Sequence, residues 1–148
     1  MTAPTLGGST VGLSRFLIRA FMRMHTWVYR RSGGQQMGWV RGARVLLLST
    51  TGRRSGRLHT VPLGSVQDGD NYVVVASNGG KNWHPAWWLN LQSNPEALIE
   101  MGSRQIAVVA QRAQDDECAR LGPLFSWLQR YQERTQREIP VVILRLVA

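Results

Sequence analysis

Three arginines lie close together in a glycine-rich turn, and residues of these types at this spacing could bind an anion. The motif TTGRRSG and the residue after it supply the candidates Arg53, Arg54, Ser55, Gly56 and Arg57. Arginine presents a planar fork of donors that suits phosphate or carboxylate, and glycine lets backbone N–H groups approach a ligand closely. The alternative is a hairpin tip whose charges are only solvated, which is the usual state of surface arginines.

The residues on both sides of this turn predict a hairpin that positions it. The stretch 45–66 reads VLLLSTTGRRSGRLHTVPLGSV, with apolar and β-branched residues before and after the turn. A second turn at 67–70 carries the Asp-Gly signal, and the run NYVVVAS at 71–77 has a strong strand propensity. The sequence therefore predicts three successive antiparallel strands.

The rest of the chain adds strands and helices that complete a barrel. In chain order we expect a short helix opened by Pro85, strands at 97–101 and 105–112, a helix from Asp115 to about Arg134 that is interrupted at Gly122–Pro123, and a closing strand at 139–147. About six mostly antiparallel strands with flanking helices predict an α+β barrel. The 148 residues contain no repeat or linker, so we expect a single domain over residues 13–148.

The N-terminal region carries most of the positive charge. The net charge is +9, and residues 1–67 contain ten arginines and no acidic residue. We expect a mobile segment over residues 1–12 and a basic amphipathic helix over 13–31, with Arg15, Arg19, Arg23 and Arg30 in one wedge and Phe21, Met24 and Trp27 among the residues opposite. Such a helix fits an anionic membrane interface; the alternative is ordinary packing on its own domain.

The single cysteine and the lack of long apolar runs indicate the cellular compartment in which we expect the protein. Cys118 is the single cysteine, so no disulfide staples the fold, and no second Cys or His stands near it at metal-ligand spacing. No run approaches the ~18 apolar residues of a spanning helix. We therefore expect a cytoplasmic protein, with the N-terminal helix as its possible contact with the inner face of the membrane.

Five motifs in order resemble the deazaflavin (F420)-dependent nitroreductase and quinone reductase family of actinobacteria. They are TTGRRSG, VPL followed by the DGD turn, VVVASNGG, HPAWWLNLQSNP and the IPVV strand, and they span residues 46–142. The resemblance implies a split β-barrel of the FMN-binding type. It also implies that reduced coenzyme F420 passes a hydride to quinones, nitroaromatics or similar activated acceptors.

The resemblance also implies roles for individual residues toward the coenzyme. Arg53, Arg54, Ser55, Gly56 and Arg57 would hold its phosphate and oligoglutamate tail. Pro62 and Leu63 would border the ring, and the loop of Ala76, Ser77, Asn78, Gly79 and Gly80 would approach the ring's hydroxyl and amide edge. Asn78 stands where family members often have lysine, which removes a charge from that loop.

On the acceptor side, the resemblance indicates Trp88 and Tyr131. Adjacent side chains on a helix point about 100° apart, so we expect that Trp87 and Trp88 do not both face the core, with Trp88 on the pocket. Tyr131 would reach over the ring and hydrogen-bond an acceptor oxygen; the alternative is a core tyrosine. Ser77 and Tyr131 are thus the candidate catalytic residues, and His84 is a weaker candidate as proton donor.

Two other classes of function fit parts of the sequence. A nucleic-acid-binding module would explain the basic N-terminal half with Trp27 and Trp39 among arginines, although no helix-turn-helix, RRM or KH pattern occurs, so we expect no nucleic-acid partner. A barrel that carries the deazaflavin or a lipid without turnover is the other alternative. We expect a small-molecule acceptor such as a quinone as the partner.

Overall fold

The structure, a computed structural model, describes the backbone of residues 7–34, 38–40 and 42–147 and the side chains of residues 19–34, 38 and 42–147. Its helices are α1 (Gly7–Arg31), α2 (Ala86–Ser93), α3 (Asp115–Leu121) and α4 (Leu128–Glu133), with short 3-10 turns η1 (Asn78–Gly80) and η2 (Gly122–Leu124). Its strands are β1 (Trp39–Val40), β2 (Ala43–Thr51), β3 (Leu58–Asp68), β4 (Asn71–Val75), β5 (Glu96–Met101), β6 (Arg104–Arg112) and β7 (Val141–Leu146). In this part of the chain, no helix is both long and apolar enough to cross a membrane.

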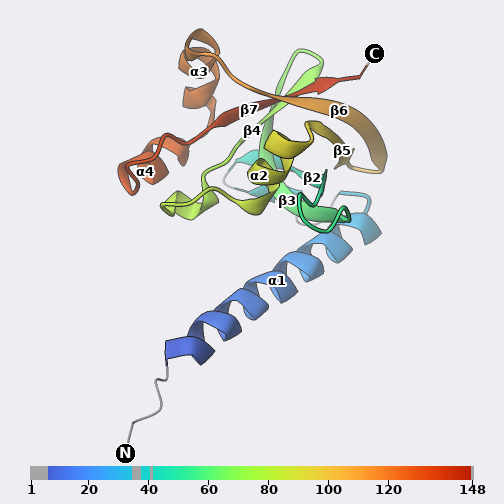
Figure 1. The fold of residues 1–148 in the computed structure, drawn as a ribbon. Coiled ribbons are helices and arrows are strands. Elements are labelled where there is room, and N and C mark those ends of the chain that lie inside the picture. The colour runs from blue at the N-terminus through green and yellow to red at the C-terminus, as the bar shows by residue number, and fades with distance from the viewer. Residues whose placement is uncertain (1–6, 35–37, 41, 148) are drawn as a thin grey trace, which may run out of the picture.

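Six strands close into an antiparallel barrel (Figure 1). The strand order is β1-β2-β3-β4-β7-β6-β5, and an additional pairing of β2 with β5 closes the ring. The predicted hairpin is present, because Thr51 pairs with Leu58 and the residues between them form the turn. The predicted three-strand succession is also confirmed, since Asp68 pairs with Asn71 across the Asp-Gly turn. β1 was not predicted, because two residues are too few for a strand pattern.

The barrel interior holds the main apolar core. Its largest contributions come from β2, β4, β5 and β7, together with residues of α2: Leu46, Leu48, Val74, Ile99, Val142, Leu144, Trp87, Trp88 and Leu91. β2 is apolar without alternation because both of its faces are covered. Leu46 and Leu48 belong to the interior, whereas Val45 and Leu47 pack with Tyr29 of α1 on the outside.

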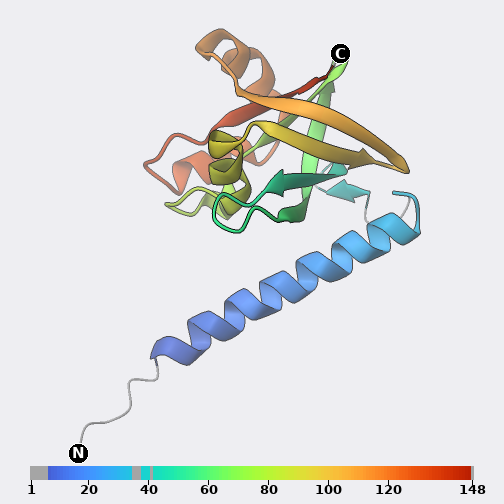
Figure 2. The ribbon, with the colours of Figure 1, turned by 45° about the vertical axis from the view of Figure 1, so that its right-hand side comes forward.

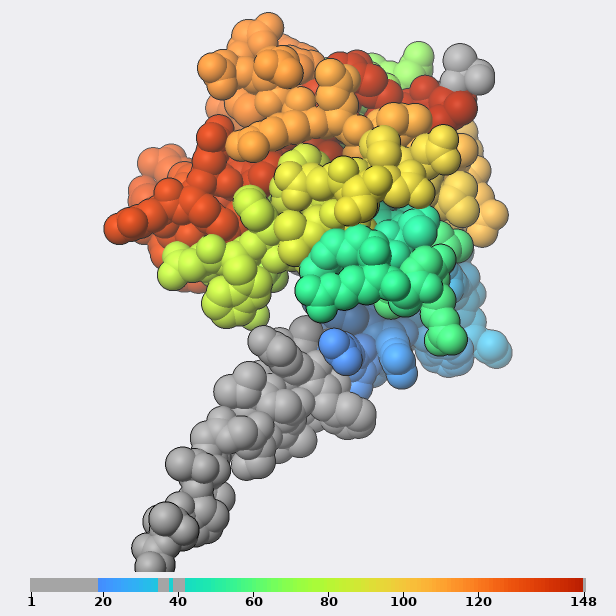
Figure 3. Space-filling model, viewed as in Figure 1, coloured from blue at the N-terminus to red at the C-terminus, as the bar shows by residue number. Residues whose placement is uncertain are grey.

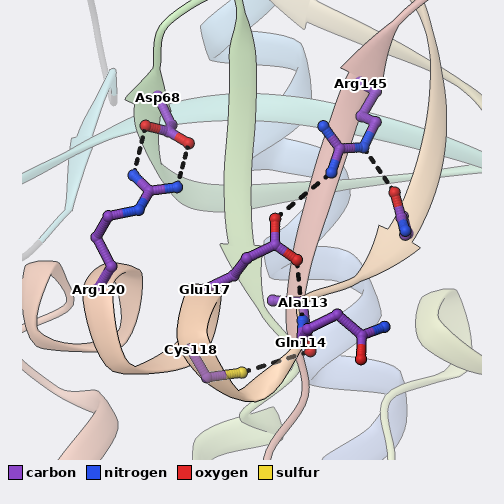
Figure 4. Close-up of polar contacts among 8 residues, drawn as sticks. Asp68, Ala113, Gln114, Glu117, Cys118, Arg120 and Arg145 are labelled. Carbon is purple, nitrogen blue, oxygen red and sulfur yellow. Dashed lines mark hydrogen bonds and ion pairs between the residues drawn. The ribbon is translucent and has the colours of Figure 1, made fainter.

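A second apolar cluster lies outside the barrel, where α3, η2 and α4 cover β4 and β7. It contains Val73, Val75, Leu121, Phe125, Tyr131, Val141 and Ile143. Polar contacts border α3, as Figure 4 shows: Arg120 pairs with Asp68 at 2.8 Å, and Arg145 approaches Glu117 at 3.5 Å. The Glu117 side chain also accepts a bond from the N–H of Gln114, which completes a capping box at the start of α3.

The helix α1 is fixed to the barrel at its C-terminal end and runs away from it toward the N-terminus (Figure 2). The Tyr29 hydroxyl accepts a bond from the Gly102 N–H at 2.8 Å, and the Arg30 guanidinium pairs with Glu100 at 2.8 Å. Both partners belong to the β5–β6 hairpin. The hairpin therefore sets the direction of the helix.

One expectation about α1 differs from the structure. The helix begins at Gly7, so residues 7–12 of the expected mobile segment are helical, and residues 1–6 lie outside the described residues. A glycine-rich start can be helical because extending an existing helix costs less than nucleating one. The face that packs on the domain holds Thr26 and Tyr29, and Phe21 and Trp27 of the expected apolar side are exposed.

Candidate active site

The arginine turn between β2 and β3 is attached to α2 by one buried amide. The Asn90 side chain is 4% exposed, and its Oδ1 accepts from the Arg53 N–H at 3.2 Å and from Arg53 Nη1 at 3.3 Å. Its Nδ2 donates to Thr50 Oγ1 at 3.1 Å. A buried amide with all these partners satisfied holds the turn in one place relative to α2.

The turn is also held from within. The Gly52 N–H donates to the Arg57 carbonyl at 2.7 Å, and the Gly56 N–H donates to the Gly52 carbonyl at 2.9 Å. Ser55 Oγ accepts from the Arg57 N–H at 3.2 Å. Gly56 has φ +71°, and a Cβ at Gly52 would lie 2.6 Å from Ser55 Oγ, so both glycines are required by the backbone path.

The positive charges of this turn are not neutralised by carboxylates of the described residues. Arg53, Arg54 and Arg57 are exposed, and no carboxylate in the described residues lies within ion-pair distance of them. The turn, α2 and the segment after β4 lie on one face of the molecule (Figure 3). The geometry thus supports an anion site rather than a turn whose charges are neutralised by the protein.

The loop after β4 has an unusual backbone. Asn78, Gly79 and Gly80 have φ values of +47°, +65° and +80°, so three successive residues lie in the left-handed region. Asn78 is stabilised by its own side chain, whose Nδ2 donates to the Trp83 carbonyl at 3.0 Å. A Cβ at Gly80 would lie 3.1 Å from the Arg134 Cβ atom and 3.2 Å from the Tyr131 carbonyl oxygen, because α4 packs directly on the loop.

Arg137 fixes this loop and was not predicted from the sequence. Its guanidinium donates to the carbonyls of Ala76 at 3.2 Å, Ser77 at 2.9 Å and Lys81 at 2.8 Å. Burial lowers the pKa of this guanidinium from its ordinary value. No spacing pattern marks a lone arginine 60 residues away from its partner, so sequence reasoning had no signal for it.

His84 is also bound to Arg137, which limits its chemistry. Arg137 Nη1 lies 3.2 Å from His84 Nδ1, and because a guanidinium only donates, Nδ1 must accept. Burial, followed by the charges of Arg137 and Arg112, lowers the pKa of His84. A neutral imidazole is therefore favoured, which argues against a proton-donating imidazolium.

The two adjacent tryptophans are both buried, so the expectation that they could not both face the core is wrong. Trp87 and Trp88 are 7% and 5% exposed and belong to the interior cluster, whereas Trp83 is exposed. Neighbouring helical residues can both be buried here because the barrel interior covers a wide sector of α2, including Leu91. Trp88 Nε1 is the one buried side-chain N or O atom of the described residues that lacks a hydrogen-bond partner.

The remaining candidates lie around this region without forming one closed site. Pro62, Leu63 and Ser77 are half-buried, and Leu63 packs against the interior cluster. Tyr131 is 9% exposed and belongs to the outer cluster, so the structure does not bring its side chain together with Trp88. A cavity of about 650 Å³ beside the loop is lined by Asn82, Glu133, Arg134, Thr135, Gln136 and Arg137.

Comparison with known sequences finds similar proteins over most of the chain. A family model described as F420H(2)-dependent quinone reductase matches residues 21–145. An F420H(2)-dependent quinone reductase of Mycobacterium tuberculosis is 37% identical over 144 residues, which cover 89% of this chain and 97% of that protein.

Solved structures with the same fold are also found. An F420-H2 dependent reductase superposes with a TM-score of 0.63 at 32% identity, covering 68% of this chain and 93% of that one. A protein described as a domain-swapped dimer superposes with a TM-score of 0.66 at 27% identity, covering 92% of this chain and 98% of that one. The predicted α+β split barrel is confirmed by the closed six-strand barrel and by these likenesses.

Proposed function

Because the chain belongs to the F420H(2)-dependent quinone reductase family, we propose that it reduces quinones, and also nitroaromatics and similar activated acceptors. Membership confirms the F420H2-dependent reductase predicted from the motifs, and with it coenzyme F420 as the cofactor. It favours this class over a carrier without turnover and over a nucleic-acid-binding module.

The turn of Arg53, Arg54 and Arg57 carries the proposal for the coenzyme tail. The phosphate and oligoglutamate tail is a flexible polyanion, which several arginines bind better than one point charge. These three are exposed, lack a carboxylate partner among the described residues, and stand on a turn that Asn90 fixes to α2. Ser55 and Gly56 would add a hydroxyl and a close backbone approach in the same turn.

The loop from Ala76 to Gly80 suits the polar edge of the ring. Its left-handed backbone leaves the N–H groups of Asn78 and Gly79 without an acceptor in the described part of the chain. Pro62 and Leu63 of β3 would border the flat apolar part. When bound, the coenzyme supplies the hydride, and the protein supplies position and electrostatics.

The acceptor would be held by Trp88 and Tyr131, with Ser77 and Tyr131 as donors to its oxygen. The unpaired N–H of Trp88 supports a polar partner there that the protein alone does not provide. Tyr131 packs in the outer cluster, yet its backbone carbonyl borders Gly80, which keeps it next to the loop. A hydroxyl that donates to the acceptor oxygen stabilises the negative charge that develops during reduction.

Titration with F420, followed by fluorescence, tests the coenzyme site. Charge-assisted hydrogen bonds are worth about 1.5 to 3 kcal/mol each, so the Arg53→Ala/Arg54→Ala double variant should bind F420 at least about tenfold more weakly. The Arg104→Ala/Arg130→Ala variant is the matched control, because it removes two exposed arginines outside the turn. Unchanged affinity in the first variant would place the anion site elsewhere. A parallel titration with FMN shows whether another flavin ring is accepted.

We further propose that α1 docks on an anionic membrane surface, where lipid-soluble quinones reside. Phe21, Met24 and Trp27 are 51%, 51% and 61% exposed, and Arg19 and Arg23 are exposed beside them. Aromatic side chains below the head groups with arginines at their level are the arrangement that binds such interfaces.

Vesicle sedimentation tests this docking. The protein should sediment with phosphatidylglycerol vesicles in preference to phosphatidylcholine vesicles, and Phe21→Ser/Trp27→Ser should abolish the preference while F420 binding stays intact. Equal sedimentation with both vesicles refutes the membrane proposal. A particle of twice the chain mass in light scattering, lost in the same variant, would instead assign the helix face to a second copy of this chain.

A further inference from the structure

We propose that Arg137 is the positioning residue of the coenzyme loop: one guanidinium ties the loop's carbonyl groups together and thereby presents its free N–H groups to the ligand. This inference rests on the proposed function for the ligand itself, since it assigns to the loop the polar edge of the F420 ring. Its geometric part concerns the protein before any ligand binds.

The contacts of Arg137 span both ends of the loop. Nη2 donates to the carbonyls of Ala76 and Ser77 at 3.2 and 2.9 Å, where the chain leaves β4. Nε donates to the Lys81 carbonyl at 2.8 Å, where the chain leaves η1. The planar fork of an arginine reaches these separated acceptors at the same time, which a lysine ammonium on a flexible stem does less well.

The ties determine which backbone groups of the loop remain available. Two of its N–H groups are used internally, because Gly80 donates to the Ser77 carbonyl at 2.8 Å and Lys81 donates to the Asn78 carbonyl at 3.2 Å. The N–H groups of Asn78 and Gly79 have no acceptor among the described residues. The carbonyls of Ala76, Ser77 and Lys81 are held by Arg137, so the loop keeps the two N–H groups of Asn78 and Gly79 as free donors.

Arg137 also brings a positive charge close to the loop. In the described residues no carboxylate forms an ion pair with this half-buried guanidinium, whose partners are carbonyls and the His84 ring. A cation held by neutral acceptors keeps its field, and that field favours a ligand edge with negative charge. Arg137 thus acts on the ligand through the loop and through its charge.

Holding the left-handed backbone in advance has a measurable effect on affinity. Ordering the backbone of a residue costs conformational entropy, so a loop that must order Asn78, Gly79 and Gly80 on binding should lose at least about tenfold in affinity. Arg137→Met keeps the aliphatic stem and removes every donor and the charge. We expect it to bind F420 at least about tenfold more weakly. We expect Arg137→Lys to recover part of that loss.

A matched control separates this role from simple stabilisation. Thr135 Oγ1 donates to Asn82 Oδ1 at 2.9 Å, which also ties the α4–β7 connection to the segment after η1. Thr135→Val removes that tie and the bond that Thr135 Oγ1 accepts from the Arg137 N–H at 3.3 Å, but it leaves the bonds from the Arg137 guanidinium to the loop carbonyls. It should lower the melting temperature yet leave F420 affinity within about twofold of wild type, a change below 0.5 kcal/mol.

Two readouts need no coenzyme. Amide hydrogen exchange at Gly80 and Lys81, whose N–H groups are bonded to the Ser77 and Asn78 carbonyls, should quicken in Arg137→Met and stay unchanged in Thr135→Val. Nitrogen NMR of His84 in the wild-type protein should show the proton on Nε2, because Nδ1 accepts from Arg137 at 3.2 Å. This measurement remains decisive if Arg137→Met does not fold.

The outcomes distinguish this inference from the proposed coenzyme site. Wild-type loop exchange and wild-type F420 affinity in Arg137→Met overturn it, as does a His84 proton on Nδ1. Equal loss of affinity in Thr135→Val and Arg137→Met also overturns it, because stabilisation alone would then explain both. If Arg53→Ala/Arg54→Ala keeps full affinity while the loop exchange responds to Arg137→Met, the tail site fails and the loop assignment stands.

Discussion

Replacing Asn90 by leucine should detach the arginine turn from α2, since one side chain makes all three bonds between them. Leucine has the same number of side-chain heavy atoms and the same branch at Cγ, so the substitution removes the hydrogen bonds without opening a cavity. The bonds lost are those to the Arg53 N–H, to Arg53 Nη1 and to Thr50 Oγ1.

The cost follows from how deeply each partner is buried. Thr50 is 0% exposed, so its hydroxyl is left without a partner, which costs about 1 to 3 kcal/mol. Arg53 is exposed and water can replace its partner, so each of its bonds contributes about 0.5 to 1.5 kcal/mol. The free energy of unfolding should therefore fall by about 2 to 6 kcal/mol. F420 should bind about tenfold more weakly, because Arg53 is no longer held toward the ligand.

Urea unfolding and F420 titration measure both quantities in the same samples. Gln92→Leu is the matched control, since Gln92 is an exposed amide on the same helix. The reasoning is refuted if Asn90→Leu binds F420 as tightly as the control. A loss of stability with unchanged affinity would mean that Asn90 supports the fold but does not position Arg53.

Three further changes test other parts of the site. Tyr131→Phe should lower quinone turnover by about 10²- to 10³-fold, because the variant loses one hydrogen-bond donor to the charge that develops on the acceptor. Its F420 affinity should be nearly unchanged. If the variant turns over quinones at the wild-type rate, Tyr131 has only a packing role. Cys118→Ala should keep both turnover and F420 binding, because burial raises the pKa of this thiol and leaves it unreactive, and a folded but inactive variant would contradict this. His84→Gln should flatten the pH dependence of stability. In the folded protein, burial and Arg137 lower the pKa of His84 from 6.5, so below that pH the unfolded chain binds a proton more readily than the folded protein. The free energy of unfolding of the wild type therefore falls as the pH drops below 6.5. Urea unfolding between pH 7 and pH 5 measures this, and equal slopes in variant and wild type would refute it.

The parts of the fold with strong local patterns could be predicted from sequence. The β2–β3 hairpin follows from β-branched runs around Gly52 and Gly56, and the β3–β4 turn follows from its Asp-Gly pair. The arginine turn could also be found, because three cations and two glycines within six residues are a local signal. In each case the neighbours in sequence are also the neighbours in space.

The contacts that fix the site could not be predicted in this way. Asn90 lies 37 residues from Arg53, and Arg137 lies 61 residues from Ala76, so barrel closure brings each pair together. A lone Asn in an apolar helix or a lone Arg before a strand has no distinctive spacing. The face of α1 that packs on the domain could not be predicted either, because the helical pattern does not show which side Tyr29 will use to reach the β5–β6 hairpin.

The place of β7 in the barrel has a consequence for the order in which the protein can acquire its function. β7 lies between β4 and β6, and it pairs Val73 of β4 with Ile143, far along the chain. During synthesis, β4 and β6 leave the ribosome before the strand that joins them, so both wait with unpaired edges. The loop from Ala76 to Gly80 directly follows β4, and Arg137 lies four residues before the start of β7. A growing chain can therefore form the arginine turn early, but Arg137 can fix the loop from Ala76 to Gly80 only after β7 is inserted. Binding of a ligand to this loop then requires the completed barrel.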